Sequence, residues 1–316
     1  MSLRVAVQMD PMEGIDIAGD STFAVMVEAQ RRGHRLHHYL APHLFYDEGR
    51  VAARARSVTV RPQAGDHFSH GEWEVLDLRA DVDVVLMRQD PPFDMAYVTA
   101  THLLERIQPD TLVVNDPASV RNAPEKLFVL DFARFMPPTM ITRSVDDVRA
   151  FQARHGEIVV KPLHGNAGAA VFKIGRDGAN LGALTELFGH VWREPFMVQA
   201  FLPSVAEGDK RIVLVDGEVA GAINRLPGKG EIRSNLAAGG RAEATELTAR
   251  EREICDALGP ELARRGLLFV GIDVIGGHLT EINVTSPTGI VALDRFNGTN
   301  TPGLIWDAIE ARAARV

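Results

Sequence analysis

Three oxygen-bearing side chains near the C-terminal end of the chain have the types and the spacing that suit a metal ion. Asp273, Glu281 and Asn283 interrupt two apolar segments that are otherwise typical of β-strands. Mg²⁺ prefers oxygen ligands and commonly takes one or two carboxylates together with phosphate oxygens and water. Glu281 and Asn283 are two residues apart, so they share one face of a strand. This segment predicts a magnesium site; the alternative, a polar face open to solvent, is disfavoured by the Ser-Pro-Thr-Gly run at 286–289.

Whether Asp273 joins the other two side chains depends on the turn between the strands. A two-residue turn at 276–277 would place Asp273 opposite Thr280, on the wrong face. A three-residue loop over 276–278 would instead pair it with Glu281. We predict the three-residue loop, and with it a common face for all three metal-ligating side chains.

Two lysines in apolar surroundings could supply positive charge for a phosphate group. Lys126 lies at the start of a helical segment, and Lys161 ends an apolar strand that leads into a small-residue loop with Gly165 and Gly168. Small residues leave backbone N–H groups accessible to an anion. The loop is neither a Walker A motif nor a dinucleotide-binding fingerprint. Taken alone, it is better explained as an ordinary turn beside a surface lysine.

A set of cationic side chains surrounds a second glycine-rich segment. The run 208–211 (Gly-Asp-Lys-Arg) opens an expected strand, and Arg225, Arg233 and Arg241 follow, the last two bracketing a Gly/Ala-rich run. Arginine binds carboxylate or phosphate through two parallel hydrogen bonds. A glycine-rich loop between arginines suits a lid that closes over a reactive intermediate and excludes water. Each arginine taken alone would be interpreted as a solvated surface charge.

The bulk composition restricts what these groups can bind. The chain has 316 residues, 46% of them hydrophobic, and a net charge of −8. Because such an acidic protein is a poor general nucleic-acid binder, an anionic ligand needs a local cationic pocket. The one cysteine, Cys255, excludes an internal disulfide and fits the reducing cytoplasm. No apolar run reaches the roughly 20 residues that span a bilayer, and the N-terminus lacks the apolar core of a signal peptide.

Short apolar strands alternate with amphipathic helices, which is typical of an α/β protein. The strands expected at 5–9, 82–87 and 111–114 end in polar, proline-containing turns, and ligands gather at such strand ends in open α/β sheets. A helix is expected at 21–32, with Ser21 as its N-cap. Further strands are expected at 158–163, 195–201 and 210–215, helices at 146–155, 248–265 and 301–315, and a hairpin at 269–284.

In this order, the motifs resemble the ATP-grasp superfamily and, within it, bacterial glutathione synthetase. The resemblance covers nearly the whole chain, from Met9-Asp10-Pro11 to residues 306–312. The runs Met-Arg-Gln-Asp-Pro-Pro-Phe-Asp at 87–94 and Asn-Leu-Ala-Ala-Gly-Gly-Arg at 235–241 are the most specific for that family. The lysines and the hairpin alone would indicate only the superfamily. The other matching segments are 21–24, 28–33, 125–128, 160–163, 208–211 and 279–288.

The resemblance implies an α/β chain, with α+β elements, that joins an ATP-grasp fold to an N-terminal open α/β domain, the pre-ATP-grasp domain. It divides the chain into an N-terminal substrate domain (1–121), a central lid domain (122–201) and a C-terminal ATP-grasp domain (202–316). ATP would lie between the sheets of the last two domains, with phosphates at Lys126 and Lys161, adenine at 199–202 and ribose at Asp209.

The resemblance also implies roles for individual residues. The ATP-binding residues would be Lys126, Lys161, Gly165, Gly168, Gln199, Phe201, Leu202, Asp209, Lys210, Arg211, Arg225 and Asn235. The metal ligands would be Asp273, Glu281 and Asn283. The substrate-binding residues would be Asp10, Ser21, Arg88, Asp90, Arg233, Ser286, Thr288 and Gly289. The catalytic side chains would be Arg211, Arg233 and Arg241.

The implied activity is the ATP-dependent joining of L-γ-glutamyl-L-cysteine to glycine, which gives glutathione, ADP and phosphate through an acyl phosphate. The resemblance further implies Mg²⁺, or Mn²⁺ in its place, no nucleic-acid or membrane partner, a cytoplasmic location and a homo-oligomer, a tetramer by analogy. Two alternatives stay open: an ATP-grasp ligase with another acyl substrate, and a non-catalytic ATP-binding module. The run at 87–94 disfavours the first, and the intact Asp273, Glu281 and Asn283 set disfavours the second.

Overall fold

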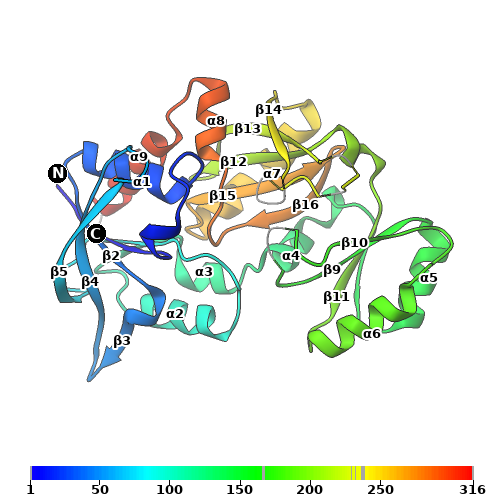
Figure 1. Cartoon of the computed structure of the whole chain (residues 1–316), viewed down its shortest axis with the longest axis horizontal. Coiled ribbons are helices and arrows are strands. Elements are labelled where there is room, and N and C mark those ends of the chain that lie inside the picture. Colours follow the sequence, from blue (N-terminus) through cyan, green and yellow to red (C-terminus); the bar gives the residue numbers. More distant parts are fainter. Residues whose placement is uncertain (1, 166–167, 229, 232, 236–238, 315–316) are drawn as a thin grey trace.

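Three β-sheets organise the chain (Figure 1). The structure is a computed structural model that describes residues 2–165, 168–228, 230–231, 233–235 and 239–314. The sheets draw their strands from residues 4–114, 139–200 and 209–283. Each sheet falls inside one of the three expected segments, whose boundaries stay predictions. In the part of the chain that the structure describes, no helix is long and apolar enough to cross a bilayer.

The first sheet has seven strands in the order β3-β4-β2-β1-β6-β7, with β5 added on β4. Its strands are β1 (Arg4–Gln8), β2 (Arg35–Tyr39), β3 (Leu44–Asp47), β4 (Arg50–Val60), β5 (Phe68–Asp77), β6 (Val84–Met87) and β7 (Leu112–Val114). β1 pairs in parallel with both β2 and β6, so the carboxyl ends of these strands meet at one edge. That edge leads into the segments after Gln8 and Met87, which carry three of the expected substrate residues, Asp10, Arg88 and Asp90.

Helices cover both faces of this first sheet. The helices are α1 (Ser21–Arg31), α2 (Met95–Glu105), α3 (Pro117–Arg121) and α9 (Thr301–Ala313). Val5 and Val7 of β1 pack into one apolar core with α1 and α9, whereas Ala6 packs into another with α2 and α3. The last helix of the chain, α9, therefore lies beside the first, α1 (Figure 1). The Trp306 ring N–H donates to the Val25 carbonyl at 2.8 Å.

The second sheet has four strands in the order β10-β9-β11-β8 and carries helices on one face. Its elements are β8 (Thr139–Thr142), α5 (Val145–His155), β9 (Ile158–Pro162), β10 (Phe172–Ile174), α6 (Leu181–Val191) and β11 (Phe196–Ala200). Ile158 and Val160 pack against both helices. Because strand side chains alternate, Val159 and Lys161 point to the opposite face, which is free of these helices.

The third sheet has five strands in the order β14-β13-β12-β15-β16. Its strands are β12 (Asp209–Val215), β13 (Glu218–Leu226), β14 (Arg241–Ala244), β15 (Phe269–Ile275) and β16 (His278–Asn283), and the helices beside it are α4 (Glu125–Phe128), α7 (Ala249–Arg264) and α8 (Ile290–Asn297). Ile212 and Leu214 of β12 face α7 in the core, so Asp209 and Arg211 face the other way. Short 3-10 segments complete the chain at Met12–Gly14, Ala41–His43, Val129–Phe135 and Pro203–Glu207.

The expectation that Ser21 caps the first helix is wrong by one residue. Asp20 is the N-cap, and its carboxylate accepts a hydrogen bond from the Phe23 backbone N–H at 2.6 Å. Either residue type can cap a helix, so the sequence alone did not distinguish them. The Ser21 hydroxyl does not take part in the cap and instead makes a contact near the site. In α7, by contrast, Thr248 and Glu251 form the capping box that the sequence indicates.

Candidate active site

One cavity of about 340 Å³ opens between the helix-free face of the second sheet and the matching face of the third. Most of the expected site residues line it. These are Asp90, Lys126, Lys161, Gly165, Gly168, Gln199, Phe201, Leu202, Asp209, Arg211, Arg225, Arg233, Asn235, Asp273, Glu281, Asn283, Ser286, Thr288 and Gly289. Side chains that lie more than 150 residues apart in the sequence thus line the same cavity.

The late hairpin brings Asp273 opposite Glu281, but not through the loop that we predicted. Ile275 pairs with His278, so the turn has two residues, Gly276 and Gly277. A β-bulge between Asp273 and Val274 then shifts the register by one residue and pairs Asp273 with Glu281. Thr280 is the extra residue, and its hydroxyl donates to the Asp273 carbonyl at 3.1 Å. The predicted pairing is confirmed, whereas the predicted three-residue loop is wrong.

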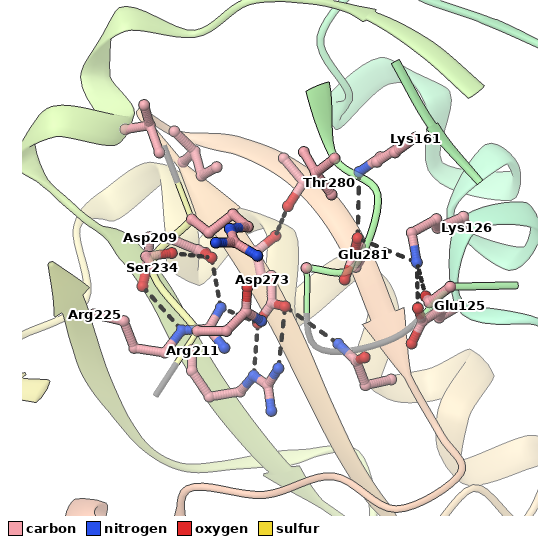
Figure 2. Close-up of a pocket in the computed structure, with 18 of the residues that line it drawn as sticks. Glu125, Lys126, Lys161, Asp209, Arg211, Arg225, Ser234, Asp273, Thr280 and Glu281 are labelled. Atoms are coloured by element: carbon pink, nitrogen blue, oxygen red, sulfur yellow. Dashed lines mark hydrogen bonds and ion pairs between the residues drawn. The ribbon is translucent and has the colours of Figure 1, made fainter. Parts of the chain in front are cut away.

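Asp273 is held by two arginines at the buried end of the cavity (Figure 2). Arg211 Nε and Nη2 donate to its two oxygens at 2.6 and 3.1 Å, and Arg225 Nη2 approaches Oδ1 at 2.9 Å. The Asn283 amide reaches the same carboxylate at 3.4 Å. Although burial opposes it, the two guanidinium groups hold the pKa of Asp273 well below its usual value. Asp273 is therefore an anion at neutral pH.

Glu281 faces two lysines that come from outside its own sheet (Figure 2). Its Oε1 lies 3.3 Å from Lys161 Nζ on β9 and 3.5 Å from Lys126 Nζ on α4. Burial disfavours its charge, but the ammonium groups lower the pKa of Glu281. Lys126 also donates to the Gly165 carbonyl at 2.6 Å, which ties α4 to the small-residue loop. The phosphate-binding and metal-binding candidates therefore meet at Glu281.

These oxygens suit a divalent cation only in company with a ligand. No group of three or more His, Cys, Asp or Glu that could hold a metal ion occurs in the ranges the structure describes. Asp273, Glu281 and the Asn283 amide oxygen could supply a partial set of hard ligands. Mg²⁺ characteristically completes such a set with phosphate oxygens and water. The donor set therefore fits Mg²⁺ brought in with a phosphorylated ligand.

Asp209 forms the other buried anionic point of the cavity. Its Oδ2 accepts from Arg225 Nη2 at 2.6 Å and from the Ser234 hydroxyl at 2.9 Å. Burial raises the pKa of Asp209 to about 6, with the nearby Asp273 charge adding to the effect of burial against the pull of Arg225. Ser234 is a site residue that our sequence analysis did not name.

The far end of the cavity is apolar. Gln199 and Ala200 end β11, and Phe201 and Leu202 follow them along the wall. Val159, Val171, Val205 and Ile275 complete this end. The Phe201 backbone N–H donates to the Glu157 carbonyl at 3.0 Å, which fixes the path of the strand. A flat aromatic base fits such an end, whereas a phosphate fits the charged one.

The small-residue loop meets the arginine-rich segment across the cavity. Gly168 has a φ of +74°, and a Cβ placed there would come within 2.7 Å of Asn235 Oδ1 and 3.2 Å of Arg233 Cδ. Glycine is therefore required both by the backbone and by the close approach. Residues 166–167, 229, 232 and 236–238 lie outside the described residues, so the expected lid over this contact stays a prediction.

Arg88 and Ser21 support the site from the N-terminal segment without lining the cavity. Arg88 is buried: it donates to the Pro287 carbonyl at 2.9 Å and to the Thr22 hydroxyl at 3.0 Å. The Ser21 hydroxyl accepts from the Gly289 backbone N–H at 3.1 Å. Both residues therefore hold the 286–289 turn, which does line the cavity, and their expected direct contact with substrate stays a prediction.

Asp10 and Asp90 form an acidic pair beside this turn. The Asp90 backbone N–H donates to Asp10 Oδ2 at 2.8 Å. Enclosure and the Asp10 carboxylate raise the pKa of Asp90, while the Ser286 hydroxyl opposes the shift. Of the two carboxylates, Asp90 lines the cavity, whereas Asp10 does not and contacts the Asp90 backbone. Asp90 could receive a substrate ammonium group there.

Two cationic side chains that were expected in the site, Lys210 and Arg241, do not line the cavity. Lys210 points to the opposite face of β12 from Arg211, and its Nζ lies 2.7 Å from Glu251 at the start of α7. Arg241 lies in β14, largely exposed, and pairs with Glu243 at 2.7 Å. Neither lines the cavity in this structure, and the expected contact of Lys210 with the nucleotide and the expected catalytic role of Arg241 stay predictions. Strand alternation gave the signal for Lys210, because it neighbours the inward-facing Arg211.

The arrangement also contains functional candidates that sequence reasoning missed. Glu125 lines the cavity and contacts the Lys126 ammonium group. Burial and the nearby Glu281 carboxylate raise its pKa against the effect of Lys126. Its place directly before Lys126, at the first residue of α4, was the available signal.

The fold and the site define an ATP-dependent carboxylate–amine ligase of the ATP-grasp class. The structure resembles D-cycloserine synthetase DcsG, with a TM-score of 0.69 and 16% identity over 98% of this chain and 99% of that one. It also resembles the ATP-grasp ligase PsnB complexed with Mg, ADP and a variant of its minimal precursor, with a TM-score of 0.63 and 20% identity over 99% of both chains.

The sequence narrows this class to one family. Residues 3–121 match the prokaryotic glutathione synthetase N-terminal domain, and residues 125–298 match the prokaryotic glutathione synthetase ATP-grasp domain. The glutathione synthetase of Rhodopseudomonas palustris is 59% identical over 99% of this chain and 100% of that protein. The chain belongs to the prokaryotic glutathione synthetase family.

Proposed function

We propose that this protein is a glutathione synthetase, which joins L-γ-glutamyl-L-cysteine to glycine with conversion of ATP to ADP and phosphate. One observation carries the proposal. In a chain of this family, Lys126 and Lys161 meet the hairpin carboxylate Glu281 in the cavity between two sheets. Cations for a phosphate tail and oxygens for Mg²⁺ are thus assembled at one point.

The first step transfers the γ-phosphoryl group to the acyl substrate. An oxygen of the cysteinyl carboxylate attacks the γ-phosphorus, the bond to the ADP oxygen breaks, and ADP leaves with the electron pair. Lys126 and Lys161 offset the charge of the phosphates, and Arg211 and Arg233 stabilise the charge that develops on the acyl phosphate. Mg²⁺ held by Asp273, Glu281 and Asn283 would neutralise phosphate charge and orient the oxygens.

The second step forms the amide bond. The glycine nitrogen attacks the acyl carbon, a C–N bond forms, and phosphate leaves from the tetrahedral intermediate with the C–O electron pair. No protein nucleophile is required, because positioning and charge stabilisation lower both barriers. Cys255 plays no such part: it is buried in α7, and burial raises the pKa of its thiol to about 12.

The remaining ligands follow from the same assignment. The apolar end at 199–202 would receive adenine, Asp209 would accept from the ribose, and Gly165, Gly168, Arg225 and Asn235 would border the phosphates. Asp90, with Ser286, Thr288 and Gly289, would hold the acyl substrate, with Arg233 at one of its carboxylates. We further propose that Mn²⁺ can replace Mg²⁺, that the reaction takes place in the cytoplasm, and that the protein is a homo-oligomer, a tetramer by family analogy.

The test is an omission experiment that follows phosphate release. The purified protein receives MgATP, γ-glutamylcysteine and glycine together, and each is then left out in turn. Glutathione should form with one phosphate per amide bond, and only in the complete mixture. Release of phosphate that does not depend on the dipeptide, or that occurs equally with other acyl substrates, would contradict the proposed activity.

A further inference from the structure

The proposed reaction leaves one proton without an acceptor. Glycine arrives as an ammonium ion, and its nitrogen can attack only after a proton has been removed. None of the residues given a role above takes that proton. A general base for this step should be an acidic side chain that lines the cavity near the phosphate end and has no role assigned above.

Among the residues that the structure describes, five acidic side chains line the cavity, and four of them are bound by arginine or have a role assigned above. Asp273 is bound by Arg211 and Arg225, and Asp209 by Arg225 and Ser234. Glu281 faces both lysines and belongs to the proposed metal site. Asp90 is assigned to the acyl substrate. The remaining carboxylate is Glu125.

Glu125 lies where the reacting groups must meet. It begins α4, immediately before Lys126, and lines both the main cavity and a small apolar side pocket that opens beside Gly165 and Thr285. In Figure 2 its carboxylate lies beside the Lys126 ammonium group on the side where Lys161 and Glu281 also meet. Glu125 therefore lines the cavity directly beside the lysine that is proposed to bind the phosphates.

We propose that the Glu125 carboxylate binds the ammonium group of the incoming glycine and accepts its proton. This inference rests on the proposed function and goes beyond it by assigning the base. The proton moves from nitrogen to a Glu125 oxygen, the freed lone pair forms the C–N bond, and phosphate leaves with the C–O electron pair. The second N–H proton leaves with the departing phosphate, and Glu125 returns its own proton to solvent.

The present partner of Glu125 explains how the carboxylate becomes available. Lys126 has three N–H donors, and they are directed to Glu125, to the Gly165 carbonyl at 2.6 Å and to Glu281 at 3.5 Å. A phosphate that binds Lys126 competes for those donors and loosens its hold on Glu125. Nucleotide binding would thus precede the step in which Glu125 receives the amine.

The charged groups around Glu125 determine whether its pKa lies above or below that of an ordinary glutamate. Lys126 lies on its own helix, Glu281 on β16, Asp273 on β15, Lys161 on β9, and His164 lies in the loop after β9, where it lines the same side pocket. Burial and the two carboxylates raise the pKa of Glu125, and the Lys126 ammonium group opposes them. A carboxylate with a raised pKa accepts a proton from an ammonium group more readily than an ordinary one.

Hydroxylamine separates this role from a purely structural one. It is uncharged at neutral pH and attacks an acyl phosphate without losing a proton first, so it needs no base. The wild-type protein and the variants Glu125→Gln and Glu125→Asp are each assayed for glutathione formation with glycine and for γ-glutamylcysteine hydroxamate formation with hydroxylamine. Glu186→Gln, an exposed carboxylate on α6 away from the cavity, is the matched control.

The expected result is a selective loss. Glu125→Gln should lower glutathione formation by about 100-fold or more, the usual contribution of a general base, while hydroxamate formation stays within a few fold of wild type. Its remaining activity with glycine should rise with pH as free amine becomes available. Glu125→Asp should recover part of the activity, and Glu186→Gln should behave as wild type in both assays.

Two results would overturn the inference. Equal loss of both activities in Glu125→Gln would mean that Glu125 only positions Lys126 for the phosphoryl step. Unchanged glutathione formation would mean that the amine loses its proton elsewhere. Failure of the wild-type protein in both assays would instead contradict the proposed function itself, so the two failures are distinguishable.

Discussion

At the scale of single residues, every cation that surrounds the hairpin carboxylates already faces an oxygen acceptor of the protein. Arg211 and Arg225 contact Asp273, and Lys126 and Lys161 contact Glu281. A buried charge is tolerated only when it is paired or strongly hydrogen-bonded. These contacts keep the charges paired until the phosphate and the metal ion take their places.

Lys161→Met should lower phosphate release with the complete substrate mixture by more than about 100-fold, because an electrostatic contact to the transferring group is lost. The matched control is Lys210→Met. Lys210 is also a largely buried lysine, but it contacts Glu251 on the opposite face of β12. Steady-state kinetics should show near-normal kcat for Lys210→Met below its unfolding temperature. If Lys210→Met were as inactive as Lys161→Met, the loss could not be attributed to the contact that Lys161 makes in the cavity.

Ser21→Ala should raise the KM for γ-glutamylcysteine by about tenfold, equivalent to about 1.4 kcal/mol, because the Gly289 N–H loses its acceptor and the 286–289 turn loosens. The KM for ATP should stay at the wild-type value, because the turn is assigned to the dipeptide and not to the nucleotide. A rise in the KM for ATP with no change for the dipeptide would reverse this assignment of the turn.

Residue types and motifs predicted most of these positions, but not which atoms they touch. The run at 87–94 identified Arg88 as a site residue, yet its guanidinium group holds the Pro287 carbonyl behind the cavity wall. Similarly, Ser21 was expected to cap the first helix, but Asp20 does so, and the Ser21 hydroxyl accepts from the Gly289 backbone N–H. Such contacts join segments almost 200 residues apart or more, and local sequence carries no signal for them.

At the scale of elements, two glycines allow α7 to lie against the turn between β12 and β13. A Cβ at Gly259 would come within 2.4 Å of the Gly217 carbonyl oxygen, and a Cβ at Gly217 would come within 2.5 Å of the Gly259 oxygen. The backbone atoms themselves are in contact, so neither element has room to yield. This close approach sets the distance between α7 and the strand that carries Asp209 and Arg211.

Gly259→Ala should lower the free energy of unfolding by about 1–3 kcal/mol, because overpacking displaces α7. The sign of this change tests the close contact, because Ala in place of Gly inside a helix ordinarily raises the free energy of unfolding by about 1 kcal/mol. Gly189→Ala in α6 is the control: nothing lies within 4 Å of its added Cβ, so it should be stabilising. Urea unfolding measures both, and a stabilised Gly259→Ala protein would show that the contact is not tight.

An ion-pair network joins α1 to α9. Glu28, which is buried, binds Arg31 at 2.7 Å and Arg32 at 2.9 Å, and Arg32 reaches Asp307 and Glu310 of α9 at 2.7 and 3.0 Å. The hydrogen bond from Arg31 outweighs burial, and with Arg32 it lowers the pKa of Glu28 from 4.5 to about 2. The folded state therefore binds a proton at Glu28 less readily than the unfolded state does.

Glu28→Gln should lower the free energy of unfolding by roughly 1–3 kcal/mol at pH 7. Because the folded-state pKa is depressed, the stabilisation is complete above pH 4.5 and is lost as the pH falls toward about 2. Urea unfolding of both proteins between pH 7 and pH 3.5 should show the difference narrowing only at the acid end. The exposed Glu253→Gln should change stability by less than about 1 kcal/mol at either pH.

Element positions followed well from periodicity and capping signals, but register did not. The capping box at Thr248 and the strand that ends near Lys161 lie where the sequence indicates. The β-bulge at Thr280 was not foreseen, because a bulge depends on the side-chain hydroxyl bonding back to Asp273 and on the burial of both strand faces. Asp273 lies on the expected face of its strand, but the bulge places it there and not a three-residue loop.

At the scale of the whole molecule, the family resemblance implied three domains with a nucleotide between the sheets of the last two, and the structure has a cavity between two sheets at that place. The docking of the C-terminal helix on the first helix could not be predicted in the same way. Trp306 and Ile309 of α9 lie in one core with Val5 and Phe23, nearly 300 residues away, and this packing depends on complementary shape rather than on any local pattern. As a result, the segment that carries the hairpin is anchored on the N-terminal segment.

The proposed ligase activity requires that a nucleotide's phosphates and a divalent cation enter one cavity at the point where Lys126, Lys161 and Glu281 meet. The most direct test is the affinity for a non-hydrolysable ATP analogue, measured by calorimetry with and without Mg²⁺ on the wild-type protein and on Glu281→Gln. Mg²⁺ should tighten wild-type binding by about tenfold or more, or about 1.4 kcal/mol, and should have little effect on Glu281→Gln. An equal effect of Mg²⁺ on both proteins, or no binding of the analogue to the wild-type protein, would contradict the claim.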